Sequence, residues 1–183
     1  IHLFFKLQDL FIFQPMEVHR RSLDPPASHI AERGRSPARG CINIICLQSL
    51  LRCVLFMKDR VLRIFSKLDQ PVDAILLVND EEPIADASFF HATGVTSGLF
   101  EHCPAILFPD GRLKLISSKL EETSARTTSA EVLPYFTSAE RAELMRSALK
   151  GVSRLGVNGL GITYHWTREI EAAAPGVKLV DVA

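Results

Sequence analysis

The sequence predicts an α/β domain with a mixed β-sheet of about six strands, one antiparallel hairpin and flanking helices. From residue 57 onward, short apolar runs bounded by turn residues alternate with segments of helical periodicity. The run over 104–117 contains the turn Pro109-Asp110-Gly111-Arg112, which is typical of an antiparallel hairpin. Apolar residues make up 47% of the 183 residues and charged residues 23%, so one domain can bury a core.

The elements before the hairpin are predicted to be a helix, a strand and a second helix. Residues 57–70 carry apolar side chains on one helical face, and Pro71 ends that helix. The residues of this face are Val61, Ile64, Phe65 and Leu68. Residues 72–79 form a short apolar run, which predicts a buried strand. A helix over 86–91 is expected to pack its aromatic pair inward and to stop at Gly94.

After the hairpin, helices and strands continue to alternate. We expect a helix over 119–126, a strand over 131–136, a helix ending at Gly151, a strand over 154–158, a helix over 163–174 and a strand over 177–183. Pro134 cannot donate a ladder hydrogen bond, so the strand around it is expected at a sheet edge. Either Thr137 or Ser138 can cap the helix that follows.

Residues 1–56 have a different character. They hold 7 of the 21 Lys and Arg residues but 4 of the 21 Asp and Glu residues, and an Arg-, Pro- and Ser-rich stretch separates two apolar runs. The basic stretch follows the first apolar run, which is the wrong order for a signal peptide. One interpretation is a membrane or partner anchor. We favour a disordered or artefactual leader of translated upstream sequence, with the domain starting at Met57.

Charge and cysteine content exclude several classes of protein. The formal net charge is zero, which does not favour nucleic acid or an anionic membrane as a partner. Cys41, Cys46 and Cys53 are spaced C-x4-C-x6-C and Cys103 lies far away, so no C-x2-C zinc or redox motif exists. We interpret the cysteines as reduced thiols in an intracellular, cytoplasmic protein.

One glycine-rich turn invites a dinucleotide-binding interpretation. Gly159 and Gly161 lie between a predicted strand and helix, and Asp181 follows 20 residues after the second glycine. Tyr164 occupies the third position of the fingerprint, where its bulk opposes close packing of helix and strand. A structural turn is therefore the favoured interpretation, and the dinucleotide site stays open as a hypothesis.

The remaining motifs do not form a self-sufficient catalytic site. Ser97 in the run over 94–98 sits one place too late for a nucleophile elbow. His165 and Glu169 share a helical face, but two ligands do not make a zinc site. Adjacent residues over 101–103 point in different directions in a strand. His91 alone is more often a half-buried polar residue than a catalytic one.

The order of these elements from Met57 to Ala183, about two-thirds of the chain, resembles the creatinase/prolidase N-terminal domain. The segment Phe-Phe-His-Ala-Thr-Gly over 89–94 stands where that family carries an aromatic-x-Thr/Ser-Gly phrase. The resemblance implies the ribonuclease H-like fold of that domain, which precedes the catalytic domain of Xaa-Pro peptidases such as prolidase and aminopeptidase P. Residues 1–56 match nothing in the family pattern.

In that family the chemistry belongs to a C-terminal domain, where two Asp, one His and two Glu hold a pair of divalent metals (Mn, Co or Zn). The motifs of those five ligands are missing from this sequence, so no metal or catalytic residue is assigned here. The resemblance implies a non-catalytic domain of a metal-dependent peptidase, isolated by truncation or by a misassembled coding sequence, and predicted to be inactive alone.

The resemblance also implies a homodimer in which the N-terminal domain shapes access for proline-containing peptides. The loop after the Thr-Gly phrase can approach the active site of the partner subunit. By position, the residues on the substrate side are His91, Thr93, Gly94 and His102. The alternative is a stand-alone peptide- or protein-binding module derived from a peptidase.

Overall fold

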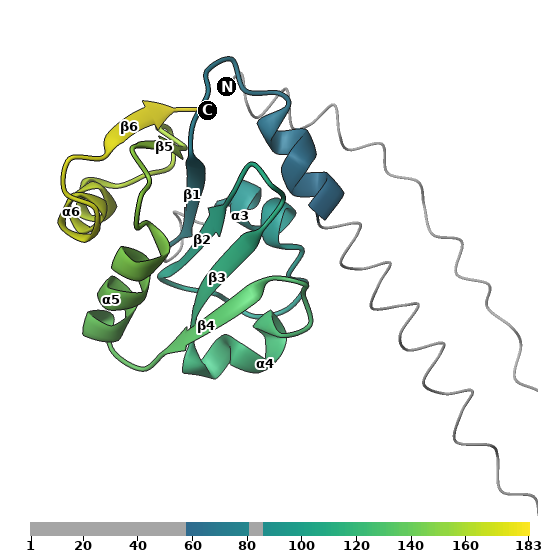
Figure 1. Cartoon of the computed structure of the whole chain (residues 1–183). Coiled ribbons are helices and arrows are strands. Elements are labelled where there is room, and N and C mark those ends of the chain that lie inside the picture. Colours follow the sequence, from purple (N-terminus) through teal and green to yellow (C-terminus); the bar gives the residue numbers. More distant parts are fainter. Residues whose placement is uncertain (1–57, 81–85) are drawn as a thin grey trace, which may run out of the picture.

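The computed structural model describes residues 58–80 and 86–183, and these form the coloured ribbon of Figure 1. The expected leader over 1–56, its boundary at Met57 and three of the four cysteines lie outside the described residues.

Within these two ranges, six strands form one sheet. The strands are β1 (Ala74–Asn79), β2 (Cys103–Leu107), β3 (Leu113–Ser118), β4 (Glu131–Tyr135), β5 (Arg154–Val157) and β6 (Lys178–Asp181), in the order β4-β3-β2-β1-β5-β6. Only β2 runs against its neighbours, because its pairs with β1 and β3 are antiparallel and the other pairs are parallel. The predicted mixed sheet is confirmed. The other five strands end at one edge, which we call the carboxyl edge.

The hairpin and the edge strand are found as the turn residues and Pro134 predict. In the turn between β2 and β3, the Phe108 N–H donates to the Arg112 carbonyl at 2.9 Å. Gly111 takes a φ of 87°, which L side chains rarely adopt. β4 is an outer strand, so Pro134 can sit in it without removing a hydrogen bond from the sheet interior.

Helices cover both faces of the sheet (Figure 1). They are the first helix (residues 58–65), α3 (Ala87–Thr93), the 3-10 turn η1 (Lys119–Glu121), α4 (Glu122–Ala125), α5 (Ser138–Ala148) and α6 (Tyr164–Ala173). The first helix, α3 and α4 pack on one face, around Val61 and Phe89. α5 and α6 pack on the other face, around Met145 and Trp166.

Two predicted helices differ in extent from the observed ones. The first was expected to reach residue 70 but ends at 65, where the Lys67 and Leu68 N–H groups donate three residues back and tighten the chain into a turn. Leu68 still packs against the core. The helix predicted over 119–126 is η1 followed by the short α4. Just after it, the hydroxyls of Thr127 and Thr128 donate to the carbonyls of Ser124 and Ala125, which helps to end α4.

The helix ends follow their capping residues. The Asp86 side chain accepts from the Ser88 N–H at 2.8 Å and starts α3, and Gly94 ends it with a φ of 69°. Thr137, rather than Ser138, caps α5, and Glu140 completes a capping box. Phe89 is fully buried, as expected for the inner face of α3, and Phe90 is half-buried against the same core.

Asp73 ties the start of β1 to the start of β5. Its Oδ2 accepts from the N–H groups of Ser153 and Arg154, each at 2.8 Å. These two backbone hydrogen bonds, Arg154 first, lower the pKa of Asp73 below its ordinary value because they favour the charged carboxylate.

The exchange Asp73→Asn is expected to destabilise the domain at neutral pH but not in acid. A group whose folded pKa is lowered contributes stability that is present above its ordinary pKa and is lost as pH falls through the folded value. The difference in free energy of unfolding between wild type and variant should therefore shrink as pH falls below the ordinary aspartate range. Urea unfolding at a series of pH values measures this; a constant difference would contradict the assignment.

Candidate functional site

Charged and aromatic side chains gather at the carboxyl edge of the sheet. They come from the end of β1, the loop before β2, the end of β4 and the helices α5 and α6. We call this group the edge cluster; its members are Asp80, His102, Tyr135, Arg141, Trp166 and Glu169.

Asp80 links the loop before β2 to α6. Its Oδ1 lies 2.7 Å from Nδ1 of His102, and its Oδ2 accepts from Nε1 of Trp166 at 3.0 Å. The Asp80 side chain is 15% exposed and that of His102 is 41% exposed. The Trp166 ring is buried, and its N–H obtains the partner that a buried indole needs. Both oxygens of Asp80 are therefore used to fix neighbouring elements.

Arg141 is the most deeply buried charge of the edge cluster. The residue is 6% exposed, and its Nη2 donates to both oxygens of Glu169 at 2.8 and 2.9 Å. Its guanidinium lies 4.7 Å from the centre of the Trp166 ring and 5.8 Å from that of Tyr135. Its Nε has no hydrogen-bond partner among the described residues. Arg141 thus joins α5 to α6 across the face of the sheet.

The loop before β2 holds two strained residues. Phe100 and His102 have φ values of 53° and 54°, a region that costs a non-glycine residue about 1 kcal/mol or more. Asn79 Nδ2 donates to the carbonyls of Leu99 at 2.8 Å and Phe100 at 3.2 Å. The His102 carbonyl accepts from the Tyr135 hydroxyl at 3.1 Å and from Arg141 Nη1 at 3.4 Å. These contacts hold the loop in its strained shape.

The edge cluster contains no activated nucleophile. Burial raises the pKa of the Cys103 thiol to about 11 and that of the Tyr135 hydroxyl to about 12. Both groups are therefore protonated at neutral pH. Cys103 is a free, buried thiol, and the other cysteines lie outside the described residues.

The expected substrate-side residues fall into two separate contact groups. His102 belongs to the edge cluster, whereas the His91 carbonyl accepts from Arg60 Nη1 of the first helix. Burial first, then the charges of Arg60 and Arg63, lowers the pKa of His91. Thr93 is fully buried, and its hydroxyl donates to the Phe89 carbonyl at 2.8 Å.

Sequence reasoning missed most of the edge cluster. Asp80, Arg141 and Trp166 were not singled out, because no motif joins residues that far apart in the chain. One signal was available for Asp80, which directly follows a buried strand. His165 and Glu169 do face one another, at 3.2 Å, but Arg141 already pairs with the same carboxylate. Within residues 58–80 and 86–183 no group of three metal-ligating side chains occurs.

The glycine-rich turn after β5 is hydrogen-bonded to Asp181 of the same domain. Asp181 Oδ1 accepts from the Gly159 N–H at 3.0 Å, so the acidic residue of the dinucleotide hypothesis lies against the turn itself. Tyr164 is 79% exposed at the start of α6. This geometry favours a structural turn over a nucleotide site.

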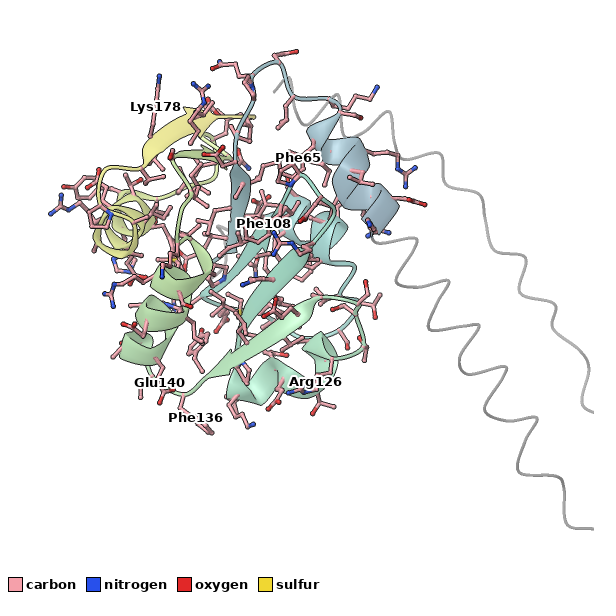
Figure 2. The ribbon with its side chains drawn as sticks, in the orientation of Figure 1. Phe65, Phe108, Arg126, Phe136, Glu140 and Lys178 are labelled. Atoms are coloured by element: carbon pink, nitrogen blue, oxygen red, sulfur yellow. The ribbon has the colours of Figure 1, made fainter. Side chains whose placement is uncertain are left out.

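Exposed apolar side chains also collect at the carboxyl edge. Leu99, Leu120 and Phe136 are 67%, 94% and 75% exposed. The Leu99 N–H donates to Glu121 at 3.0 Å, and Lys119 Nζ lies 5.7 Å from the Phe136 ring centre, so Leu99 and Phe136 each neighbour η1, which contains Leu120. Figure 2 shows Phe136 pointing away from the body of the domain. We call these three side chains the apolar patch.

A pocket of about 240 Å³ lies at the opposite end of the sheet. It is lined by Lys58, Asp110, Gly111, Arg112, Leu113, Ser129 and Glu131. Its charges balance, and Arg112 Nε is already engaged with Asp110 at 2.6 Å. The carboxyl edge is therefore the better candidate for a functional surface.

Replacing Arg141 by Ala should destabilise the domain by about 3 kcal/mol, because Glu169 loses its bidentate partner and two rings lose their cation. The control is Arg146→Ala on the same helix. Arg146 is more than half exposed and pairs with Glu143 at the surface, so we expect a loss of about 0.5 kcal/mol or less. Urea unfolding of both variants measures the difference, and equal losses would contradict the role given to Arg141.

Solved structures of peptidases share this fold. An X-Pro aminopeptidase from Thermotoga maritima matches at 17% identity with a TM-score of 0.56, over 67% of this chain and 33% of that one. The N-terminal domain of an X-Pro dipeptidase from Streptococcus pyogenes matches at 14% identity with a TM-score of 0.55, over 67% of this chain and 98% of that domain. The N-terminal domain of the cytoplasmic peptidase PepQ from Mycobacterium tuberculosis H37Rv matches at 17% identity with a TM-score of 0.52, over 70% and 93%.

The chain spans about a third of the length of the full-length peptidases that it matches. No curated protein sequence matches it. The sequence model of the creatinase/prolidase N-terminal domain matches residues 59–183, which include all six strands and all the helices from α3 to α6. The chain therefore belongs to the creatinase/prolidase N-terminal domain family.

Proposed function

We propose that this chain is the non-catalytic N-terminal domain of a metal-dependent Xaa-Pro peptidase, in which it supports dimerisation and shapes substrate access. The observation that carries the proposal is the family match over residues 59–183. In the matched full-length peptidases the same fold makes up about a third of the chain. The alternative is a stand-alone module that binds peptides or proteins.

The described residues do not fit the metal pair of such a peptidase. Among residues 58–80 and 86–183 no group of three or more His, Cys, Asp or Glu side chains could hold a metal ion. In this proposal the metal pair (Mn, Co or Zn) and the hydrolytic chemistry belong to the catalytic domain of the family.

In this proposal the loop before β2 is the part that faces a proline-containing peptide. Of the four residues expected on the substrate side, His102 has a side chain that is 41% exposed. Thr93 is fully buried, and Gly94 serves α3 as its left-handed cap. We propose that Thr93 and Gly94 shape the loop, and that His102 and the half-buried His91 border the path of the peptide.

The apolar patch supports the dimerisation role. Leu99, Leu120 and Phe136 are each more than half exposed, and grouped exposed apolar side chains are typical of interaction surfaces. We propose a cytoplasmic location, as for the matched peptidase PepQ. Within the part of the chain that the structure describes, no helix is long and apolar enough to cross a membrane.

The purified chain, supplied with Mn²⁺ or Co²⁺, is expected to show no hydrolysis of an Xaa-Pro dipeptide. The reason is that it lacks the motifs of the five family ligands. Release of free proline is the readout, and a full-length Xaa-Pro peptidase in the same buffer is the positive control. Metal-dependent turnover by the chain alone would overturn the non-catalytic assignment. Peptide affinity by calorimetry without turnover would favour the binding module.

Phe136→Glu is expected to weaken self-association of the chain about ten-fold or more, because it places a charge in the apolar patch. Leu62→Glu is the matched control, since Leu62 is a 38% exposed apolar residue of the first helix, away from the carboxyl edge. Sedimentation velocity over a concentration series measures both. A wild-type chain that stays monomeric at all concentrations would contradict dimerisation through this domain.

A further inference from the structure

The turn between β5 and α6 contains an asparagine followed by a glycine, a pair in which the backbone nitrogen of the glycine can attack the asparagine side chain. Asn158 is followed by Gly159, which is exposed and carries no side chain to shield its backbone nitrogen. In any peptide, that nitrogen can attack the preceding side-chain amide and form a five-membered succinimide. The rate depends on what removes the N–H proton and on what stabilises the developing oxyanion.

Both of those catalytic contacts are present in this turn. The Gly159 N–H donates to Asp181 Oδ1 at 3.0 Å, so a carboxylate already holds the proton that must leave. The Leu160 N–H donates to Asn158 Oδ1 at 3.2 Å, so a backbone donor already points at the oxygen on which negative charge develops. The turn therefore supplies a base, Asp181, at the attacking nitrogen of Gly159, and a hydrogen-bond donor, the Leu160 N–H, at the amide oxygen of Asn158.

The close approach of Asp181 explains why position 159 is glycine. A Cβ on Gly159 would lie 2.6 Å from the carboxyl carbon of Asp181 and 2.7 Å from each of its oxygens. Any larger residue would push the carboxylate away. The contact with Asp181 thus accounts for a glycine directly after Asn158.

We propose that Asn158 is a site of self-catalysed deamidation, with Asp181 as the general base at Gly159 and the Leu160 N–H as the oxyanion donor. It is a modification site that lies outside the peptidase chemistry and does not depend on the proposed function.

The chemistry balances with water as the only co-reactant. Asp181 takes the proton from Gly159 N, and that nitrogen forms a bond to Cγ of Asn158. The proton returns to the leaving Nδ2, the Cγ–Nδ2 bond breaks, and ammonia departs. Water then opens the succinimide at either carbonyl, which leaves an aspartate or an isoaspartate at position 158. No oxidant or reductant is needed.

The product would change the carboxyl edge. A new carboxylate at 158 stands beside that of Asp181, and isoaspartate lengthens the main chain by one methylene just before α6. α6 carries Trp166 and Glu169 of the edge cluster. Deamidation is thus expected to loosen the contacts that hold the loop before β2.

The test compares the folded chain with a synthetic peptide covering residues 154–163, both incubated in the same neutral buffer. Peptide mapping by mass spectrometry follows the gain of one dalton at Asn158, and isoaspartyl methyltransferase labelling detects isoaspartate. We expect deamidation in the folded chain to be faster than in the peptide by on the order of a hundred-fold, the lower end of general-base effects. A folded chain that reacts as slowly as the peptide, or more slowly, overturns the proposal.

The matched variant is Asp181→Asn, which keeps an oxygen that can accept from Gly159 but removes the base. Deamidation at Asn158 should fall about ten-fold or more toward the rate of the peptide, while the Leu160 N–H donor is retained. Trp166 fluorescence confirms that α6 is still folded. Asn79, whose amide is tied to Leu99 and Phe100, is the internal control and should stay unmodified. An Asp181→Asn chain that is folded and reacts at the wild-type rate would remove Asp181 from the mechanism.

Discussion

The ion pair between Arg141 and Glu169 is the interaction on which the carboxyl edge depends. Burying a guanidinium is costly unless its donors and its faces find partners. Here Nη2 of Arg141 donates to the Glu169 carboxylate, and Nη1 donates to the His102 carbonyl. The guanidinium of Arg141 also lies over the Trp166 ring. A single side chain from α5 therefore sets the position of α6 and of the loop before β2.

The backbone strain in the loop before β2 is maintained by the side chains around it. Two non-glycine residues at positive φ are unfavourable in isolation, and they are kept because Asn79, Tyr135 and the edge cluster hold the backbone. The loop is thus prepared in one conformation before any partner arrives. A prepared loop loses little conformational entropy when a partner binds, which favours binding at this edge.

Much of the fold could be predicted from local sequence, because its causes are local. Pro134 indicated an edge strand, the Pro109–Arg112 turn indicated a hairpin, and Gly94 marked the end of α3. The first helix was predicted to reach residue 70 but ends at 65, where the chain tightens into a turn. The helix predicted over 119–126 is present, divided into η1 and α4.

The site was less accessible to sequence reasoning than the fold. His102 was named only through the family resemblance, and it lies beside Asp80 in the edge cluster. Asp80 meets Trp166 across 86 positions of the chain, and Arg141 meets Glu169 across 28. Such contacts depend on the strand order, which no single segment encodes, and none of these residues stands in a recognisable motif.

The strand order has a consequence for how the chain is made. β1 can pair with β2 as soon as the next stretch is synthesised, but its other side waits for β5, which begins only at Arg154. At ordinary translation rates that delay is on the order of several seconds. During it, an apolar strand of sequence Ala-Ile-Leu-Leu-Val-Asn has one edge unpaired, the kind of edge that recruits other chains. Capture of β1 by β5, closed by the Asp73 carboxylate, therefore also decides how much of the newly made chain escapes aggregation.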